Sequence, residues 1–226
     1  MIDIAVVDYG MGNLRSVAKA LEFVAPTKSI VVTDDPEAIA SAGRVVFPGQ
    51  GAMPDCMREM DARGLRTPLV QAARSKPFLG LCIGLQMLFE SSEEGDTLGL
   101  GILPGKVVRF PAALTGPAGD KLKVPHMGWN QVYQAAPHPM WQGIADGSRF
   151  YFVHSYFAST SDPALIAGTS NYPSSFTCAI ARNNIFAVQF HPEKSQSAGL
   201  RLLSNFVSWN GTKRATQASA VPATNV

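Results

Sequence analysis

The chain has 226 residues, 46% of them hydrophobic, which is enough to bury a substantial core in one large domain or two small ones. Its formal net charge is only +2, and its basic residues are scattered along the sequence. The composition therefore excludes a basic stripe for nucleic acid and a polybasic cluster for an anionic membrane surface.

Cysteine usage and the first residues indicate a cytoplasmic protein. The three cysteines, Cys56, Cys82 and Cys178, are too sparse for a disulfide framework, and no spacing typical of a structural zinc site occurs. The opening MIDIAVVD lacks the basic segment of a secretory signal, and no apolar run approaches the roughly 20 residues that span a bilayer. We expect reduced thiols, no membrane segment, no metal site and no cofactor.

The first half alternates short apolar runs with amphipathic segments. Residues 2–8 (IDIAVVD) predict a buried strand, and residues 12–25 repeat apolar side chains at helical spacing. The runs SIVVT, RVVFP and PFLGLC predict further strands, and helices are expected over 54–74 and 83–93. This alternation predicts an α/β fold with a central, mainly parallel sheet covered by helices.

The second half contains strand-like runs joined by turns, so we expect additional antiparallel strands there. These runs are GKVVRF, NQVYQ, FYFVHSYF, ALIAGT and FTCAIAR. Residues 112–122 are typical of an exposed loop, and 197–209 of a final amphipathic helix. Residues 211–226 lack large apolar side chains except two valines, so we predict a disordered tail after one domain over 1–210.

The run KPFLGLCIGLQMLF at residues 76–89 places Cys82 between Gly80 and Gly84. A buried strand gains nothing from glycine, so two glycines beside a thiol indicate a sharp turn. A strand is expected before the cysteine and a helix after it, which is the setting of a nucleophile elbow. The positive end of that helix would favour a thiolate over a thiol. The alternative is that Cys82 is a small, inert core residue.

A thiol nucleophile needs a base, and the base needs a partner that orients it. Among the four histidines, His191 is the strongest candidate, because it follows the strand-like run IFAVQF and opens HPEKS. In an extended segment the side chains at i and i+2 point the same way, so Glu193 could hold the imidazole in one tautomer. His126 and His154 are other possible bases. The alternative is a histidine at a strand end beside a solvated glutamate.

The stretch PGQGA at residues 48–52 follows the strand-like run RVVF. A Gly-x-Gly turn after a parallel strand exposes backbone N–H groups, and acyl transfer needs such donors for its oxyanion. The N–H groups of Gly51 and Ile83 are the candidates. Taken alone, the turn is more simply an ordinary strand ending.

Together, PGQGA, GLCIGLQ and FHPEKS resemble, in order and spacing, the triad class (class I) of glutamine amidotransferases. The resemblance implies a flavodoxin-like fold and a triad of Cys82, His191 and Glu193 that hydrolyses the side-chain amide of glutamine. Within the class, DYGMGNL, PHMGWN and YFVHSYF resemble the glutaminase subunits of imidazole glycerol phosphate synthase, which act in histidine biosynthesis. The resemblance covers residues 2 to about 209.

The same resemblance implies binding residues. Gly49, Gln86 and the backbone around Ser155 and Tyr156 would hold the glutamine. The partner would be a cyclase subunit with a (β/α)8 barrel, which uses the ammonia to make imidazole glycerol phosphate and an aminoimidazole carboxamide ribotide. The residues in motifs that would face this partner are Asn13, Trp129, Asn130 and Lys194.

Two other functions stay open from the sequence. The chain could be the glutaminase of another synthase, with the same chemistry and a different partner. It could also be a non-catalytic binding module on the same scaffold, because a fold does not determine a function.

Overall fold

The computed structural model describes residues 2–116 and 119–212. Its centre is a parallel sheet whose strands are β1 (Ile4–Val7), β2 (Ile30–Thr33), β3 (Arg44–Phe47), β4 (Phe78–Leu81) and β15 (Ile185–Val188). They lie in the order β2-β1-β3-β4-β15, with every neighbouring pair parallel. This is the strand order of a flavodoxin-like, doubly wound fold, and the expected α/β class is confirmed.

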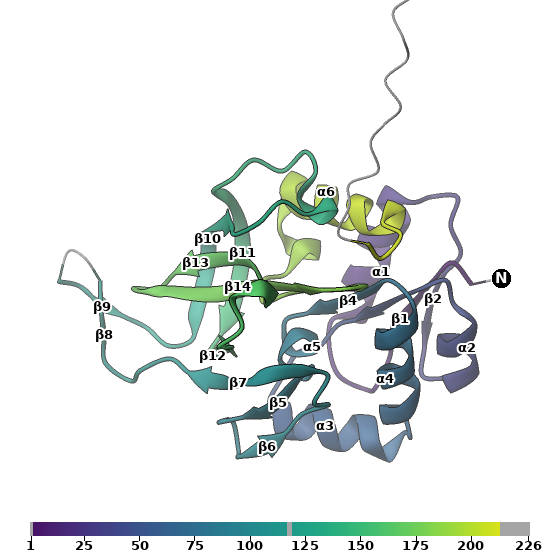
Figure 1. The fold of residues 1–226 in the computed structure, drawn as a ribbon, viewed down its shortest axis with the longest axis horizontal. Coiled ribbons are helices and arrows are strands. Elements are labelled where there is room, and N and C mark those ends of the chain that lie inside the picture. The colour runs from purple at the N-terminus through teal and green to yellow at the C-terminus, as the bar shows by residue number, and fades with distance from the viewer. Residues whose placement is uncertain (1, 117–118, 213–226) are drawn as a thin grey trace, which may run out of the picture.

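Helices cover both faces of this sheet (Figure 1). One face carries α1 (Leu14–Val24) and the C-terminal α6 (Gln196–Ser208), which pack against each other. The opposite face carries α2 (Pro36–Ser41), α3 (Met53–Ala62) and α4 (Arg66–Ser75). The helices expected over 12–25 and 197–209 are therefore present.

Side chains along each parallel strand alternate between two cores. Leu79 and Leu81 of β4 pack into the core that contains Phe206 of α6, whereas Phe78 packs into the core that contains Met60 of α3. Successive residues of a strand point to opposite faces, so a fully apolar strand is needed wherever both faces are covered. The continuous apolar runs in the first half of the sequence have this cause.

The second half extends the sheet with the antiparallel strands that the sequence predicts. Its strands are β5 (Phe89–Ser92), β6 (Thr97–Leu98), β7 (Leu103–Arg109), β10 (His126–Gln134), β11 (Ser148–His154), β12 (Tyr156–Ser159), β13 (Ile166–Asn171) and β14 (Ser175–Arg182), with 3-10 turns at Pro139–Trp141 and Pro163–Leu165. Strand β14 pairs antiparallel with β15, β13 and β12, and β12 pairs with β7. Strand β10 pairs with β11 and β13.

The helix expected over 83–93 is wrong beyond its first turn. Helix α5 spans only Ile83–Gln86, and the chain then enters strand β5. The Met87 carbonyl accepts a hydrogen bond from the Leu100 N–H, and the Leu88 carbonyl accepts from the N–H groups of residues 102 and 103. These tertiary bonds use carbonyls that a longer helix would need, so they end it.

The single helical stretch expected over 54–74 is two helices, because Gly64 separates α3 from α4. Gly64 has φ +68°, and its N–H donates to the Asp61 carbonyl while the Leu65 N–H donates to the Met60 carbonyl. These two bonds form a Schellman motif, the common way in which a glycine ends a helix.

Two further expectations need correction, and a third lies largely outside the described residues. Residues 112–122 contain a small hairpin of β8 (Leu114–Thr115) and β9 (Lys121–Leu122) that projects from the body in Figure 1. The run at 150–157 is broken at Ser155 into two strands. The tail expected to be disordered, 211–226, lies outside the described residues from 213 onward.

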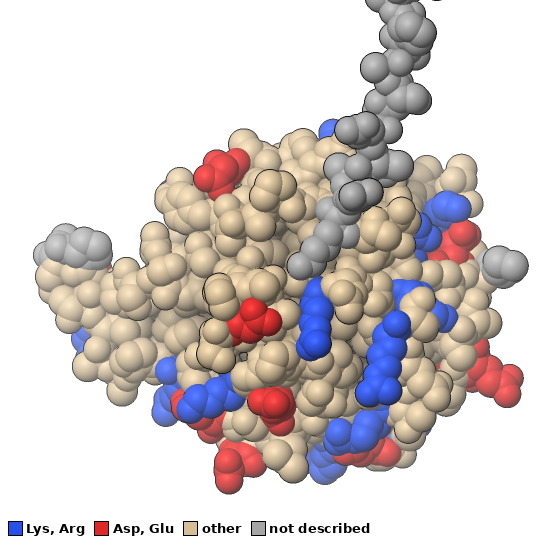
Figure 2. Space-filling view, viewed as in Figure 1, with Lys and Arg blue, Asp and Glu red and all other residues tan. Residues whose placement is uncertain are grey.

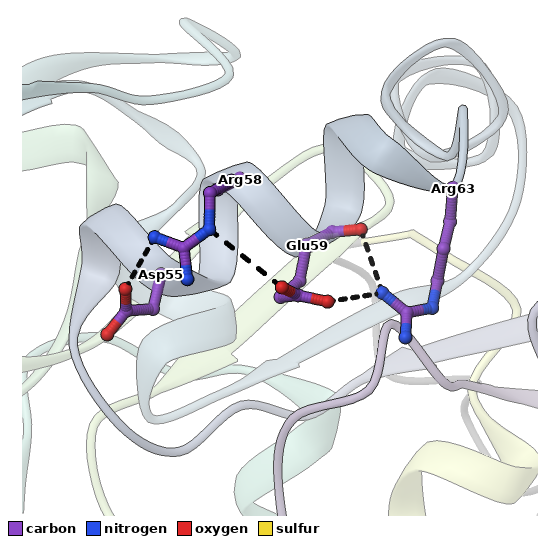
Figure 3. Close-up of polar contacts among 4 residues, drawn as sticks. All are labelled: Asp55, Arg58, Glu59 and Arg63. Atoms are coloured by element: carbon purple, nitrogen blue, oxygen red, sulfur yellow. Dashed lines mark hydrogen bonds and ion pairs between the residues drawn. The ribbon is translucent and has the colours of Figure 1, made fainter.

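The surface charges on the face in Figure 2 are of both signs and interspersed. On α3, Arg58 contacts Asp55 at 2.7 Å and Arg63 contacts Glu59 at 2.7 Å (Figure 3). Exposed pairs at this helical spacing contribute about 0.3–0.5 kcal/mol each, so they support the helix and do not form a site. None of the described helices is long and apolar enough to cross a membrane.

Candidate active site

Cys82 occupies the turn between β4 and α5 in a backbone conformation that a non-glycine residue rarely adopts. Its φ is +54° and its ψ is −109°. The Cys82 N–H donates to the Val188 carbonyl of the neighbouring strand β15, and the Cys82 carbonyl accepts the first hydrogen bonds of α5. Backbone of this kind persists only where the surroundings impose it, and it is frequent at functional sites.

The glycines beside Cys82 provide space, not a turn conformation. Gly80 lies within β4 and Gly84 within α5, and neither has a positive φ. A Cβ atom on Gly84 would lie 1.9 Å from the Phe47 carbonyl oxygen, and one on Gly80 would lie 2.9 Å from Cβ of Ala187. The glycines therefore let β3 and β15 approach the elbow closely.

His191 and Glu193 are joined in the interior. Nδ1 of His191 lies 2.9 Å from Oε1 of Glu193, and their side chains are 3% and 1% exposed. The expected pairing of His191 with Glu193 is present. It was expected from an extended backbone, whereas residues Pro192–Lys194 form a 3-10 turn. His191 lines the same cavity as Cys82, and within the described residues its Nε2 atom has no hydrogen-bond partner.

Burial and neighbouring charges act on His191 in opposite directions. Burial by itself lowers the pKa of His191, whereas the negative charges available on Cys82 and Glu193 raise it. The charges prevail, and the pKa rises from 6.5 to about 10. The environment therefore favours the imidazolium form of His191.

The turn after β3 lies against the elbow. Gly49 has no room for a side chain, since its Cβ would lie 2.8 Å from Cβ of Ile83. The thiol of Cys56 donates to the Gln50 carbonyl at 3.4 Å. In a trans peptide the N–H points opposite to the carbonyl, so the Gly51 N–H is directed away from Cys56. No acceptor occurs among the described residues for this N–H or for that of Ile83, the first residue of α5.

These parts surround a cavity of about 410 Å³. Gln86, buried at 1% exposure, donates from Nε2 to the Tyr156 carbonyl at 3.1 Å and to Oε1 of Gln189 at 3.1 Å. Its own Oε1 has no partner in the described part of the chain. Gln86, Ser155 and Tyr156 all line the cavity, and so does Gly51, whereas Gly49 lines a smaller cavity beside Glu193.

The family model for class-I glutamine amidotransferases matches residues 5–209. The chain belongs to the class-I glutamine amidotransferases. It is 69% identical over 95% of both chains to the imidazole glycerol phosphate synthase subunit HisH of Thiobacillus denitrificans. It is also 67% identical, over 92% of this chain and 99% of the other, to the same subunit of Aromatoleum aromaticum. Within the class, the chain therefore belongs to the family of these HisH subunits.

Solved structures show the same fold at low sequence identity. A putative GMP synthase component from Thermoplasma acidophilum superposes with a TM-score of 0.68 at 19% identity, covering 92% of this chain and 93% of its own. A second structure, described as a glutamine amidotransferase, superposes with a TM-score of 0.67 at 14% identity, covering 91% of this chain and 99% of its own. The present chain is therefore an enzyme, a glutamine amidotransferase, and its class uses a cysteine nucleophile.

The residues expected at a partner interface lie at and near the cavity. Lys194 lines the cavity, and its Nζ lies 5.9 Å from the centre of the Tyr151 ring. The G-W-N setting of Trp129 suggests a loop, but Trp129 lies within strand β10, where it is 42% exposed, and Asn130 lies in the same strand, as the run NQVYQ predicts. Asn13 lines the small cavity beside Glu193, so it lies behind the triad candidates.

The other two cysteines of the amidotransferase are structural. Burial raises the pKa of Cys56 to about 11 and raises that of Cys178 further, so neither provides a thiolate at neutral pH. Both are free thiols at 0% exposure.

Sequence reasoning missed two polar residues of the site. Gln189 is fully buried, and its Nε2 lies 3.7 Å from Sγ of Cys82. Glu94 lines the cavity and accepts from the Met53 N–H at the start of α3, at 2.8 Å. A glutamine inside the apolar run IFAVQF could have indicated the first. No pattern in the neighbouring sequence indicates Glu94 as a site residue, because its position depends on the early end of helix α5.

Proposed function

We propose that Cys82, His191 and Glu193 are the catalytic triad of this amidotransferase, acting as the glutaminase subunit of imidazole glycerol phosphate synthase. The observation that carries the proposal is the buried His191–Glu193 pair, with Nε2 left for the strained Cys82 across one cavity. A base fixed on one nitrogen and free on the other is what a thiol nucleophile requires.

The first half of the reaction forms a thioester. The Cys82 thiolate attacks the side-chain carbonyl carbon of glutamine, and the carbonyl oxygen becomes an oxyanion. The N–H groups of Gly51 and Ile83 donate to this oxygen, which is supported by their lack of other acceptors among the described residues. His191 gives its proton to the departing nitrogen, the carbon–nitrogen bond breaks, and ammonia leaves.

The second half releases glutamate. Neutral His191 takes a proton from a water molecule, which attacks the thioester carbon, and the oxyanion forms again at the same donors. The carbon–sulfur bond breaks, the Cys82 thiolate is restored, and His191 is again an imidazolium. Glu193 keeps its hydrogen bond to Nδ1 throughout, which stabilises the cation that forms in each cycle.

Glutamine is held by groups around the cavity. The unpaired Oε1 of Gln86 is an acceptor that lines it, and a glutamine substrate has amide and amine donors to offer. The Ser155–Tyr156 segment, where the strand is interrupted, provides backbone groups. Gly49 has a different role, because it leaves space for Ile83 to bring its N–H to the oxyanion.

The proposed partner is the cyclase subunit, with a (β/α)8 barrel, in a cytoplasmic heterodimer. Its docking surface includes the outer face of β10, where Met127, Trp129 and Tyr133 are 66%, 42% and 37% exposed. Alternate residues of a strand share a face, so these three side chains lie on one side of β10, with the polar Gln131 between Trp129 and Tyr133, and they are named here the β10 stripe. Trp129, Asn130, Lys194 and Asn13 are the residues we assign to partner contact.

The test compares glutamine with free ammonia as nitrogen source. In the complex with the cyclase, Cys82→Ser should lower glutamine-dependent synthesis by more than about a thousandfold, because the weaker nucleophile cannot form the thioester. Synthesis from added ammonium salt should stay within about twofold of the unmodified complex, and the measurement is the rate of imidazole glycerol phosphate formation.

The matched control is Cys178→Ser, which changes a buried thiol away from the cavity and should leave glutamine-dependent synthesis nearly unchanged in folded protein. Substantial glutamine-dependent activity in Cys82→Ser would remove Cys82 from the mechanism. Loss of both activities in an intact complex would refute the division of labour between the subunits.

A further inference from the structure

Two buried histidines next to the active site take no part in the proposed chemistry. His126 of β10 and His154 of β11 are cross-strand partners, 4% and 5% exposed, and Nδ1 of His126 lies 2.9 Å from Nε2 of His154. The His126 ring stacks on Phe152 and on Tyr172, at centroid distances of 5.0 and 4.1 Å. Buried polar groups are normally hydrogen-bonded, so each of the four ring nitrogens needs a partner.

One end of this pair determines the position of every ring proton. Nδ1 of His154 lies 2.8 Å from the Tyr156 carbonyl oxygen, which can only accept, so Nδ1 carries the proton. In a neutral ring, Nε2 of His154 is then an acceptor, and the facing Nδ1 of His126 must donate. His126 therefore also has its proton on Nδ1, and its Nε2 is left as an acceptor.

The other end requires the same tautomers independently. Oδ1 of Asn130 accepts from the Gln131 N–H at 2.8 Å, and Nδ2 donates to the Asn171 carbonyl at 2.9 Å. The amide orientation is therefore determined, and Nδ2 is the group 3.2 Å from Nε2 of His126. Burial lowers the pKa of His126 to about 4 and that of His154 to about 3, which keeps both rings neutral near pH 7.

The hydrogen bonds continue into the glutamine site. The Tyr156 carbonyl that accepts from His154 also accepts from Nε2 of Gln86 at 3.1 Å. The same Gln86 nitrogen donates to Oε1 of Gln189 at 3.1 Å, and Nε2 of Gln189 lies 3.7 Å from Sγ of Cys82. Contacts between polar groups thus link the exposed strand β10 to the proposed nucleophile.

We propose that His126 and His154 are positioning residues: with Asn130 they form a one-directional relay of hydrogen bonds that holds the Tyr156 carbonyl, and through it the Gln86 amide, in place for glutamine. The proposal rests on the proposed function of this cavity. Asn130 is half-buried on β10 and next in sequence to Trp129 of the β10 stripe, so the relay begins beside the proposed docking face and ends at the glutamine site.

Asn130→Asp tests the direction of the relay with almost no change of shape. A carboxylate cannot donate, so it would draw the proton of His126 onto Nε2. Nδ1 of His126 and Nε2 of His154 would then face each other as two acceptors. We expect KM for glutamine to rise about three- to tenfold, the loss of one neutral hydrogen bond, with kcat changed less than about twofold. The assay uses a saturating concentration of the cyclase, so that a change in partner affinity does not alter the measured KM.

Nitrogen-15 NMR of the histidine rings supplies the second readout, which a purely structural role would not predict. The unmodified protein should show both rings neutral at pH 7, with the proton on Nδ1, the less common tautomer in solution. Asn130→Asp should move the His126 proton to Nε2. Gln142→Glu, which adds the same charge at an exposed position outside the relay and the β10 stripe, is the control and should change neither the tautomers nor KM.

The outcomes separate this proposal from the function on which it rests. No glutaminase activity in the unmodified complex would defeat the proposed function itself. Normal activity with Nε2-protonated rings, or an unchanged KM in Asn130→Asp, would overturn the relay alone. If Asn130→Asp does not fold, His126→Phe keeps the ring stacking, removes both nitrogens and is expected to give the same rise in KM.

Discussion

At the scale of single residues, the site depends on how closely backbones can approach Cys82. The elbow has φ +54°, and a Cβ on either flanking glycine would collide with a neighbouring strand. Gly80 and Gly84 lie on either side of the turn and admit neighbouring strands, whereas the strain itself is on the cysteine. The one-turn α5 also means that a long helix dipole does not act on the thiol, so His191 is the main source of positive charge beside it.

Gly84→Ala should therefore damage both stability and activity. The added methyl group would lie 1.9 Å from the Phe47 carbonyl oxygen, which belongs to the central strand β3 and cannot move alone. We expect a loss of about 1–3 kcal/mol in the free energy of unfolding, measured by urea denaturation, together with reduced glutaminase activity. A Gly84→Ala protein with unchanged unfolding would show that β3 can shift, and the close approach would then have no structural role.

At the scale of secondary-structure elements, strand β10 has two different faces. Its buried side presents His126 to the relay, and its exposed side presents the β10 stripe to solvent. Large exposed apolar side chains gathered on one face of a strand are typical of a protein interface. The Trp129 ring packs edge-on at 6.3 Å from Tyr151, whose ring lies below Lys194, so the stripe continues to the rim of the cavity.

Trp129→Ala should weaken cyclase binding by about 2 kcal/mol, roughly a 30-fold rise in Kd, because aromatic anchors dominate interface energies. Isothermal titration calorimetry measures this directly. Phe23→Ala is the matched control, since Phe23 is 75% exposed on α1 and outside the stripe. An equal effect of the two changes, or none from Trp129→Ala, would place the interface elsewhere.

At the scale of the whole molecule, the histidines set the pH dependence of stability in two opposite ways. The folded-state pKa of His191 is raised from 6.5 to about 10, so its contribution is fully present below pH 6.5 and is lost as the pH rises toward 10. The folded-state pKa values of His126 and His154 are lowered to about 4 and about 3, so their contribution is present above pH 6.5 and is lost as the pH falls.

Together, these three histidines contribute most to the free energy of unfolding near pH 6.5. Urea denaturation across a range of about pH 4 to 10 should show the free energy of unfolding falling on both sides of that value. His191→Gln should flatten the alkaline side and His126→Phe should reduce the slope on the acid side, because each removes one group whose proton binding differs between the two states. An alkaline slope that His191→Gln leaves unchanged would contradict the assigned charge of His191.

Local pattern in the sequence was enough to predict the architecture and the triad candidates. Continuous apolar runs alternating with helical periodicity predict covered parallel strands, and that architecture is confirmed. The triad candidates were also accessible, because GLCIGL and HPEKS each place the reactive residue at a strand end. The argument for Glu193 relied on an extended backbone, and the pairing arises from a 3-10 turn instead.

Features that depend on distant hydrogen bonds became visible only in the folded chain. Helix α5 ends at Gln86 because the carbonyls of residues 87 and 88 accept from the N–H groups of residues 100, 102 and 103, and no local preference reveals this. His126 and His154 are 28 residues apart and Gln86 and Gln189 are 103 apart, so their contacts exist only in the folded sheet. Side-chain periodicity records which face of an element is buried, whereas the polar partner on that face is set by strand order and register.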